Sequence, residues 1–336
     1  MSSKNSANPV CKKVIHLAVS IMLLAVSFPA AAQQPKKVPR IGILLPNPPA
    51  VSPQLVKAFH QGLRELGYVE GRSIVIEYRF GEGKSDRYPD LAAELVQLRV
   101  DVIVTASTPA IEVIKNATST IPIVMAASAD PVGSGLIASL DHPGGNITGL
   151  TMLSPELSGK RLELLRETVP RLSRVAVVWN PRNRSSAASW KENQLAAQGL
   201  KMQLQSIEMR GPSDFHNLPD ALVRGRFQAL NVIRDPLIGA HLKWVLEFAA
   251  KTRLPAIYET EEYVDAGGLM SYGTNHPDLY RRAAYFVDRI LKGAKLSDLP
   301  VEQPTKFEFV INLKAAKEIG VTIPPGVLMW ADRVIK

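Results

Sequence analysis

The stretch RIGILLPNPP (residues 40–49) decides the fold, because RVAVVWNPRN (residues 174–183) repeats its pattern later in the chain. Each copy is an apolar run followed by Asn-Pro. A helix-like stretch then ends at a glycine, 27 positions after the start of the first copy and 25 after the start of the second. A strand-like run follows each glycine, at 73–80 and at 202–208. Two similar strand–helix–strand lobes predict a cleft between them, and clefts of this kind are where small ligands bind.

The other apolar runs indicate how the strands are arranged. They are nearly continuous at 41–45, 102–104, 121–125 and 175–178. Continuous apolar runs are typical of parallel strands that helices cover on both faces. Strands that alternate with helices of about 10–15 residues predict an α/β fold. We therefore expect two doubly wound, Rossmann-like lobes joined by a multi-segment hinge.

The first 32 residues have the pattern of a secretory signal peptide. Lysines precede an apolar stretch at 14–28, and small residues follow at 29–32, so we expect cleavage after Ala32. The alternative is a membrane anchor. That interpretation is weaker because the apolar stretch has only 15 residues, whereas a spanning helix needs about 20. We therefore expect an exported, periplasmic protein.

Composition narrows the remaining function classes. The chain has 336 residues, 46% of them apolar, which is enough for about two domains with real cores. Its only cysteine, Cys11, lies in the expected signal peptide, so the rest of the chain has no thiol chemistry. Removing residues 1–32 takes away three lysines and no acidic residue, so the net charge falls from +9 to +6. Without a run of basic residues or interleaved aromatic residues, we expect no nucleic-acid partner.

The long C-terminal part predicts that the chain crosses between the lobes more than once. After the second lobe, the sequence predicts a strand at 268–271, a helix at 277–292, a strand at 306–311 and helical pieces at 313–319 and 326–335. We expect one lobe to contain 38–146 plus about 260–295, and the other 152–257 plus about 305–336. The predicted crossings lie near 146–152, 258–268 and 297–306.

Polar residues follow the predicted strands at the point where each strand ends. Ligands gather at the carboxyl ends of strands in open α/β sheets. The candidate ligand contacts are Asn47, Ser107, Thr108, Ser128, Asp130, Asn180, Asp235 and Tyr258. The helix start at Ser107-Thr108 can hold a carboxylate, and Asp235 can hold an ammonium group. This chemistry suits an amino acid or a related zwitterion.

The same residues have a simpler interpretation that stays open at this point. Asn-Pro, Asp-Pro and Ser/Thr before a helix are ordinary turn and N-cap chemistry. Asp130, for example, can simply cap the segment 132–140. In the same way, the acidic cluster at 259–262 is expected to be a solvated turn rather than a group for acid–base chemistry or a cation site.

The chain lacks the common sequence motifs for catalysis, metal binding and cofactor binding. The chain contains no H-E-x-x-H, G-x-S-x-G or P-loop pattern, and its histidines lack ligand spacing. We therefore expect no enzyme activity, no metal and no cofactor. Two alternatives remain: a two-lobed hydrolase or isomerase that uses Asp130 and Asp235, and an exported ligand-sensing protein.

Long segments of the chain resemble one protein family. They include GLRELGYVEGRSIVIEYRFGEG (62–83), DVIVTASTPA (101–110), ELSGKRLELLRE (156–167), RVAVVWNP (174–181) and RLPAIYETEEYVDAGGLMSYGTN (253–275). Over about 38–336, the chain is similar to ABC transporter substrate-binding proteins of the tryptophan/tyrosine-type or uncharacterised group.

The resemblance implies a type I periplasmic-binding-protein fold with three crossing segments, closure of the lobes around the ligand, and an inner-membrane permease with its ATPase as partners. We expect the protein itself to be a monomer. The family pattern often has Gly where this chain has Ala106 or Ser107, so the residue expected near a ligand carboxylate differs here.

Overall fold

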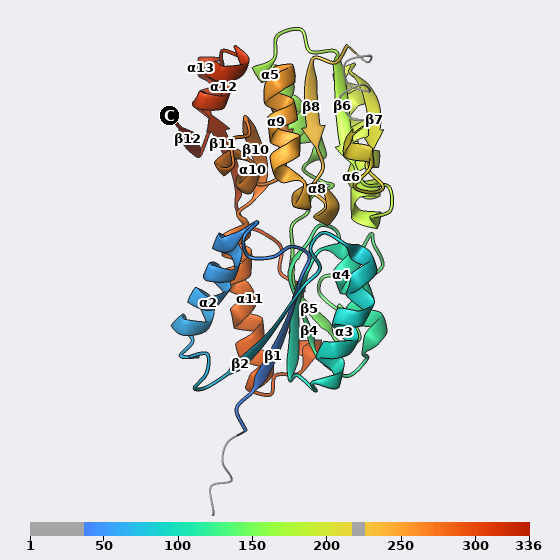
Figure 1. Ribbon diagram of the computed structural model, residues 1–336, viewed down its shortest axis with the longest axis vertical. Coiled ribbons are helices and arrows are strands. Elements are labelled where there is room, and N and C mark those ends of the chain that lie inside the picture. Colours follow the sequence, from blue (N-terminus) through green and yellow to red (C-terminus); the bar gives the residue numbers. More distant parts are fainter. Residues whose placement is uncertain (1–36, 217–225) are drawn as a thin grey trace, which may run out of the picture. The chain divides into compact units, whose positions relative to one another are not determined.

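The computed structural model describes residues 37–216 and 226–336, and Pro39–Lys336 forms one compact unit. The signal peptide expected at 1–32 lies outside the described residues. Two β-sheets divide the unit into two lobes (Figure 1). Within the described ranges, no helix has the length and apolar character of a membrane span.

The first lobe contains a five-stranded sheet in the order β2-β1-β3-β4-β5, with all neighbouring strands parallel. Its strands are β1 (Arg40–Leu45), β2 (Val75–Phe80), β3 (Val102–Ala106), β4 (Ile123–Ser128) and β5 (Ile147–Thr151). Its helices are α2 (Pro53–Glu65), α3 (Tyr88–Gln97), α4 (Thr108–Ala117) and α11 (His276–Leu291), with 3-10 turns at Ser85–Arg87 and Leu296–Asp298.

Helices cover both faces of this sheet, which explains the continuous apolar runs. Successive side chains of a strand point to opposite faces. Ile41 and Ile43 belong to the core under α2 and α11, whereas Leu44 belongs to the core under α3 and α4. Helices α2 and α11 also pack on each other. The contact is close at Gly62, where an added Cβ would lie 2.3 Å from the carbonyl oxygen of Arg281.

The second lobe contains a seven-stranded sheet in the order β12-β11-β10-β9-β8-β6-β7. Its strands are β6 (Arg174–Trp179), β7 (Gln203–Glu208), β8 (Ala229–Val232), β9 (Ala256–Tyr258), β10 (Met270–Thr274), β11 (Phe307–Asn312) and β12 (Arg333–Ile335). Its helices are α5 (Ser158–Thr168), α6 (Arg184–Leu200), α8 (Pro236–Ala240), α9 (Leu242–Thr252), α10 (Glu261–Asp265), α12 (Leu313–Ile319) and α13 (Pro325–Leu328). The strands pair in parallel except for β10 with β11.

The two faces of the second sheet are also both buried. Val177 and Trp179 pack with Trp190 of α6, while Ala176 and Val178 pack in the core that α9 completes. Successive side chains of β6 therefore face opposite sides of the sheet, as expected for a strand that is covered on both faces.

The pairing of β10 corrects the predicted division of the chain. Residues of about 260–295 were expected in the first lobe. However, β10 pairs with β9 and β11 in the second sheet, and α10 packs on β10. The chain returns to the first lobe with α11, which packs on α2 and β4. The backbone hydrogen bonds of Met270–Thr274 require neighbouring strands, so the chain leaves the second sheet after β10 rather than near 258–268.

Strand pairing also fixes where the chain makes its other two crossings. β5 still pairs with β4 in the first sheet, so the chain crosses after Thr151. On the return, Glu302 runs beside β5: its N–H donates to the Gly149 carbonyl over 2.9 Å, and its carbonyl accepts from the Thr151 N–H over 3.0 Å. The chain then crosses again before β11 at Phe307.

The helix expected at 326–335 is wrong over most of its length. The helix α13 is only four residues long, and β12 follows it along β11. Asp332 explains the change, because its carboxylate accepts a hydrogen bond from the Phe309 N–H over 2.8 Å, and its own N–H donates to the Phe309 carbonyl over 2.9 Å.

Candidate functional site

The lobes touch where loops leave the carboxyl ends of β1 and β8. The Asn47 Nδ2 donates to the Pro236 carbonyl over 3.4 Å. Nearby, a Cβ added to Gly83 would lie 2.3 Å from the Ala240 Cβ, so glycine is needed for this approach. The contact joins residues that follow strands of two different sheets. It therefore lies at the position where α/β sheets bind ligands.

Two cavities flank this contact, and both are lined by Asp235 and Pro236. The larger cavity has a volume of about 470 Å³ and takes walls from both lobes, including Tyr88, Asn180 and Arg182. The smaller cavity has a volume of about 40 Å³. Drug-sized ligands occupy clefts of about 300–1,000 Å³, so only the larger cavity has room for the body of a small solute.

Asp235 is held in place by its own lobe. Its carboxylate accepts hydrogen bonds from Asn180 Nδ2 over 3.1 Å, from Asn183 Nδ2 over 2.8 Å and from the Leu237 N–H over 2.8 Å. The last of these bonds caps helix α8. Burial raises the pKa of the Asp235 carboxyl, and the hydrogen bonds from Asn183 and Asn180 oppose that rise. The capping role considered from the sequence is therefore present, and Asp235 also borders both cavities.

The first lobe presents buried hydroxyl groups where β3 and β4 end. Ser107, Thr108 and Ser128 are buried, and none of their hydroxyls has a hydrogen-bond partner among the described residues. Ser107 has φ +73°, a left-handed conformation that favours glycine, and it directly precedes α4. A glycine at this position would adopt the same conformation without strain. The hydroxyls do not line either of the two cavities, although the adjacent Pro109 lines the larger one.

Two of the predicted ligand contacts, Asp130 and Tyr258, line neither of the two cavities. The Asp130 carboxylate accepts from the Gly133 N–H over 2.7 Å, so it closes a local turn. Tyr258 is fully buried in the core of the second lobe, where its ring stacks on Tyr263 with centroids 4.8 Å apart. The structure thus brings together Asn47, Asn180 and Asp235, but places Asp130 and Tyr258 elsewhere.

The expected solvated turn at 259–262 is wrong, because its side chains are buried. Glu259 is 3% exposed, and Glu261 and Glu262 are each 8% exposed. The Glu262 carboxylate lies 3.3 Å from His276 Nδ1. Burial alone would raise the pKa of Glu262, but the hydrogen bond from His276 and the charge of Arg234 lower it overall. Glu262 therefore stays ionised beside the smaller cavity, which it lines.

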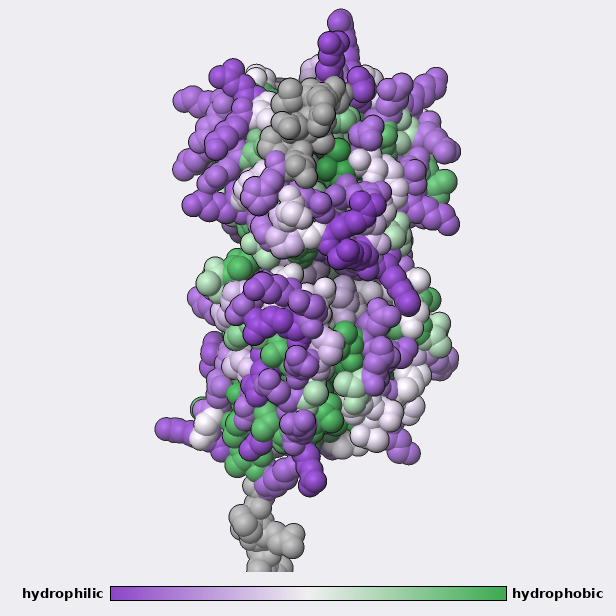
Figure 2. Space-filling view, turned by 45° about the vertical axis from the view of Figure 1, so that its right-hand side comes forward, coloured by the Kyte–Doolittle hydropathy of each residue, from purple (hydrophilic) through white to green (hydrophobic). Residues whose placement is uncertain are grey.

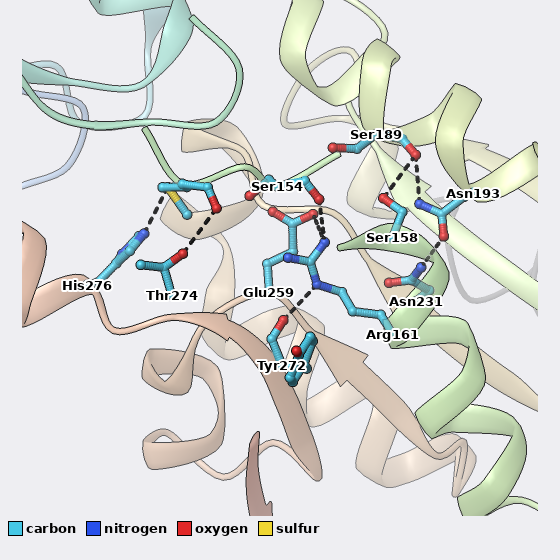
Figure 3. Close-up of polar contacts among 11 residues, drawn as sticks. Ser154, Ser158, Arg161, Ser189, Asn193, Asn231, Glu259, Tyr272, Thr274 and His276 are labelled. Atoms are coloured by element: carbon cyan, nitrogen blue, oxygen red, sulfur yellow. Dashed lines mark hydrogen bonds and ion pairs between the residues drawn. The ribbon is translucent and has the colours of Figure 1, made fainter. Parts of the chain in front are cut away.

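A buried polar network at the base of the second lobe holds the segments that cross between the lobes (Figure 3). Arg161 of α5 donates to the Ser154 carbonyl over 2.9 Å, to Glu259 Oε1 over 3.0 Å and to the Tyr272 carbonyl over 2.8 Å. Thr274 donates to the Met152 carbonyl over 3.1 Å. The first crossing segment is thus tied to the ends of β9 and β10.

Several residues of the cavities were not identified as ligand contacts from the sequence. They are Tyr88, Arg182 and Asn183 in the larger cavity and Arg234, Glu262 and Tyr280 in the smaller one. Arg234 directly follows a predicted strand, and this position could have identified it as a ligand contact. The tyrosines lie on helices, where a sequence pattern does not distinguish a core residue from a cavity wall.

Metal ligation finds no support in the part of the chain that the structure describes. No group of three or more His, Cys, Asp or Glu side chains there is arranged to hold an ion. Hydrophilic side chains predominate on the face shown in Figure 2. The cleft between the lobes is therefore the main candidate site.

The two-lobed α/β architecture, with polar groups gathered where the lobes meet, is that of a periplasmic-type solute-binding protein. The sequence comparison is more specific: residues 49–335 match the model of the ABC transporter substrate binding protein family, and the chain belongs to this family. This confirms the family resemblance and the predicted fold class. The chain is thus a substrate-binding protein of an ABC transporter.

Proteins with similar sequences or structures align with most of this chain. A tyrosine-binding protein of Clostridioides difficile (strain R20291) is 29% identical over 266 residues, which cover 79% of this chain and 76% of the relative. A conserved domain protein from Vibrio cholerae is 26% identical with a TM-score of 0.83, covering 89% of this chain and 100% of that structure. An ABC domain from Streptococcus pneumoniae in complex with L-Trp is 27% identical with a TM-score of 0.82, covering 88% and 99%.

Proposed function

We propose that this protein captures an amino acid with an aromatic side chain in the cleft between its lobes and delivers it to an ABC importer. It does so as a monomer in the periplasm, after removal of residues 1–32, and its partners are the inner-membrane permease and the ATPase of that importer. The ligand lies in the larger cavity, against Asn180 and Asp235, and the hydroxyls of Ser107, Thr108 and Ser128 contact it when the lobes close.

The observation that carries this proposal is a group of buried polar atoms without partners on one edge of the first lobe. None of these atoms has a hydrogen-bond partner among the described residues: Asn47 Oδ1, Tyr88 Oη, Thr105 Oγ1, Ser107 Oγ, Thr108 Oγ1 and Ser128 Oγ. A buried polar group left unpaired costs about 1–3 kcal/mol. A polar ligand that binds at this edge would recover part of that cost, which favours binding of a hydrogen-bonding solute.

The ligand class is supported by the relatives. One is named for tyrosine binding, and another was solved with L-Trp. An amino acid also fits the charges of the cleft, since Asp235 and Glu262 are acidic and Arg234 and Arg182 are basic. A zwitterion needs groups of both signs.

A catalytic role for Asp130 and Asp235 has less support. Asp130 closes a turn through the Gly133 N–H, and Asp235 accepts three hydrogen bonds within its own lobe. General acid–base catalysis needs a group within reach of the substrate and free to exchange a proton. Binding without turnover is therefore the function that we propose.

The test is isothermal titration calorimetry of the purified protein with L-tryptophan, L-tyrosine, L-phenylalanine, L-leucine and glycine. We expect saturable binding of at least one aromatic amino acid, with no chemical change in the recovered compound. The same ligand should raise the melting temperature, because a hundredfold excess over Kd stabilises the folded state by about 2.7 kcal/mol. Binding of glycine and leucine alone would refute the aromatic assignment, and turnover of the recovered compound would refute a receptor role.

A further inference from the structure

Arg234 presents unused hydrogen-bond donors to the smaller cavity. It directly follows β8 and lines that cavity. Within the described residues its guanidinium makes no hydrogen bond and no ion pair within 4 Å; its electrostatic neighbours are Glu262, Tyr280, Tyr263 and Glu259. A guanidinium carries five N–H donors, and such groups are rarely left unpaired away from bulk water.

The nearest carboxylates do not meet this need. Glu262 is engaged by His276 at 3.3 Å. Asp235 accepts its three hydrogen bonds from Asn180, Asn183 and Leu237. Arg234 therefore has negative charge nearby, which favours its charged form, but no acceptor in contact with its donors.

The cavity beside Arg234 has the size of one small anionic group. Its volume is about 40 Å³, and a water-sized group needs roughly 10–15 Å³ by this kind of measure. The space thus holds about three heavy atoms, which is the size of a carboxylate. One further group of its lining can donate to an anion and lacks a partner in the described part of the chain: the hydroxyl of Tyr263, a residue only 3% exposed.

We propose that Arg234 binds the α-carboxylate of the ligand in the smaller cavity, while the rest of the ligand lies in the larger one. This inference rests on the proposed amino-acid function. A planar guanidinium can bind a carboxylate through two parallel hydrogen bonds. Asp235 borders both cavities. The ligand ammonium, which is attached to the same carbon as the carboxylate, is thereby placed at an acidic residue.

This assignment competes with the one that the sequence suggested. There, the carboxylate was expected at the start of helix α4, near Ser107 and Thr108. Neither residue lines the smaller cavity. The two positions can be separated by experiment because they differ in which substitution removes the preference for a carboxylate.

The experiment compares amino acids with the corresponding amines that lack the carboxylate. Calorimetry with L-tyrosine against tyramine, and with L-tryptophan against tryptamine, gives an acid-to-amine affinity ratio. For the wild-type protein we expect a ratio of roughly 30 or more, because loss of one partner of a buried, hydrogen-bonded charge pair has effects of that size or larger. The ratio for Arg234→Gln should fall to within a few-fold of one, and the ratio for Thr108→Val should stay at the wild-type value.

Two further variants control for charge and for folding. Arg289→Gln removes the same charge from an exposed position on α11, about 13 Å along the helix from Tyr280, and should leave the ratio unchanged. Arg234→Lys keeps a cation near Glu262 and so protects the fold, but it cannot bind a carboxylate through two parallel N–H groups. Its ratio should fall several-fold. A structural role of Arg234 alone would weaken acid and amine equally and leave the ratio unchanged.

The outcomes separate this inference from the proposed function. Binding of none of the four compounds by the wild-type protein would overturn the proposed function and this inference with it. Binding with an unchanged ratio in both Arg234 variants would overturn this inference alone. The smaller cavity could instead bind a free anion. In that case sodium acetate would stabilise the ligand-free wild-type protein but not Arg234→Gln, and the acid-to-amine ratio would be the same in both proteins. That result also overturns the inference.

Discussion

Two buried tyrosines allow a matched test of whether the unpaired hydroxyls serve a ligand. Tyr88 and Tyr258 are both 0% exposed, and neither hydroxyl has a hydrogen-bond partner among the described residues. Burial raises the pKa of both hydroxyls, so both remain protonated and able to donate. They differ in place, because Tyr88 lines the larger cavity and Tyr258 lies in the core of the second lobe.

The substitutions Tyr88→Phe and Tyr258→Phe remove one oxygen atom each and keep the ring. In the free protein each should leave the free energy of unfolding unchanged or raise it by up to about 1–3 kcal/mol, since an unpaired buried hydroxyl is removed. In the complex, a hydrogen bond to the ligand is worth about 1 kcal/mol net, which corresponds to roughly a fivefold change in Kd. We therefore expect Tyr88→Phe to weaken binding about fivefold and Tyr258→Phe to leave Kd unchanged.

The assay is urea denaturation of the two free variants, followed by calorimetric titration with the aromatic amino acid that the wild-type protein binds best. Equal Kd values for the wild-type protein and Tyr88→Phe would refute the reasoning, because they would show that this hydroxyl does not contact ligand. A large loss of stability in either variant would also refute it, since that result would reveal a hydrogen-bond partner for the hydroxyl.

Three further predictions concern stability. Arg161→Met leaves the Glu259 carboxylate buried without its partner and should lower the unfolding free energy by about 3–5 kcal/mol; urea denaturation should show that adding Glu259→Gln recovers part of the loss. Burial raises the pKa of Glu261 to about 7 from 4.5. Its protonated carboxyl therefore contributes fully to the free energy of unfolding below pH 4.5, and this contribution is lost as the pH rises through 7. Glu261→Gln should accordingly stabilise the protein at pH 8 by up to about 3 kcal/mol and have little effect at pH 4.5, as unfolding curves at both values will show. Gly62→Ala should destabilise the packing of α2 on α11 by about 1–3 kcal/mol, whereas Gly199→Ala in α6, where a Cβ meets nothing within 4 Å, should stabilise by about 0.5–1 kcal/mol; thermal melts will distinguish the two.

The central strands of both sheets could be predicted because their burial follows from their own residues, whereas β12 was expected to be helical. The run at 175–178, for example, is buried on both faces, and its continuous apolar character reports that directly. The placement of β10 could not be predicted in the same way. The sequence of Met270–Thr274 indicates a strand, but its partners β9 and β11 lie at very different distances along the chain. Strand pairing depends on those partners and not on local pattern.

The buried charges were missed for a related reason. Glu259 looks like a surface residue until Arg161, 98 positions away, is known to lie beside it. His276 has the same effect on Glu262. A buried charge requires a partner, and the identity of that partner is set by tertiary structure. For the candidate site, strand-end position identified Asn47, Asn180 and Asp235, but it also selected Tyr258, which lies in the core.

Under the proposed function, the exposed contacts between the lobes bear on what would drive closure. Beside the Asn47 contact, Arg184 of α6 donates to the Ser134 carbonyl over 3.3 Å and lies 3.5 Å from the Glu112 carboxylate. The Arg184 side chain is 64% exposed, and an exposed ion pair contributes only about 0–1 kcal/mol. Such contacts cannot by themselves hold the lobes together against the freedom gained on opening. A ligand that forms hydrogen bonds with buried acceptors and donors of both lobes can hold the lobes together. It binds the closed state more tightly than the open state, by the free energy of each contact that only closure allows.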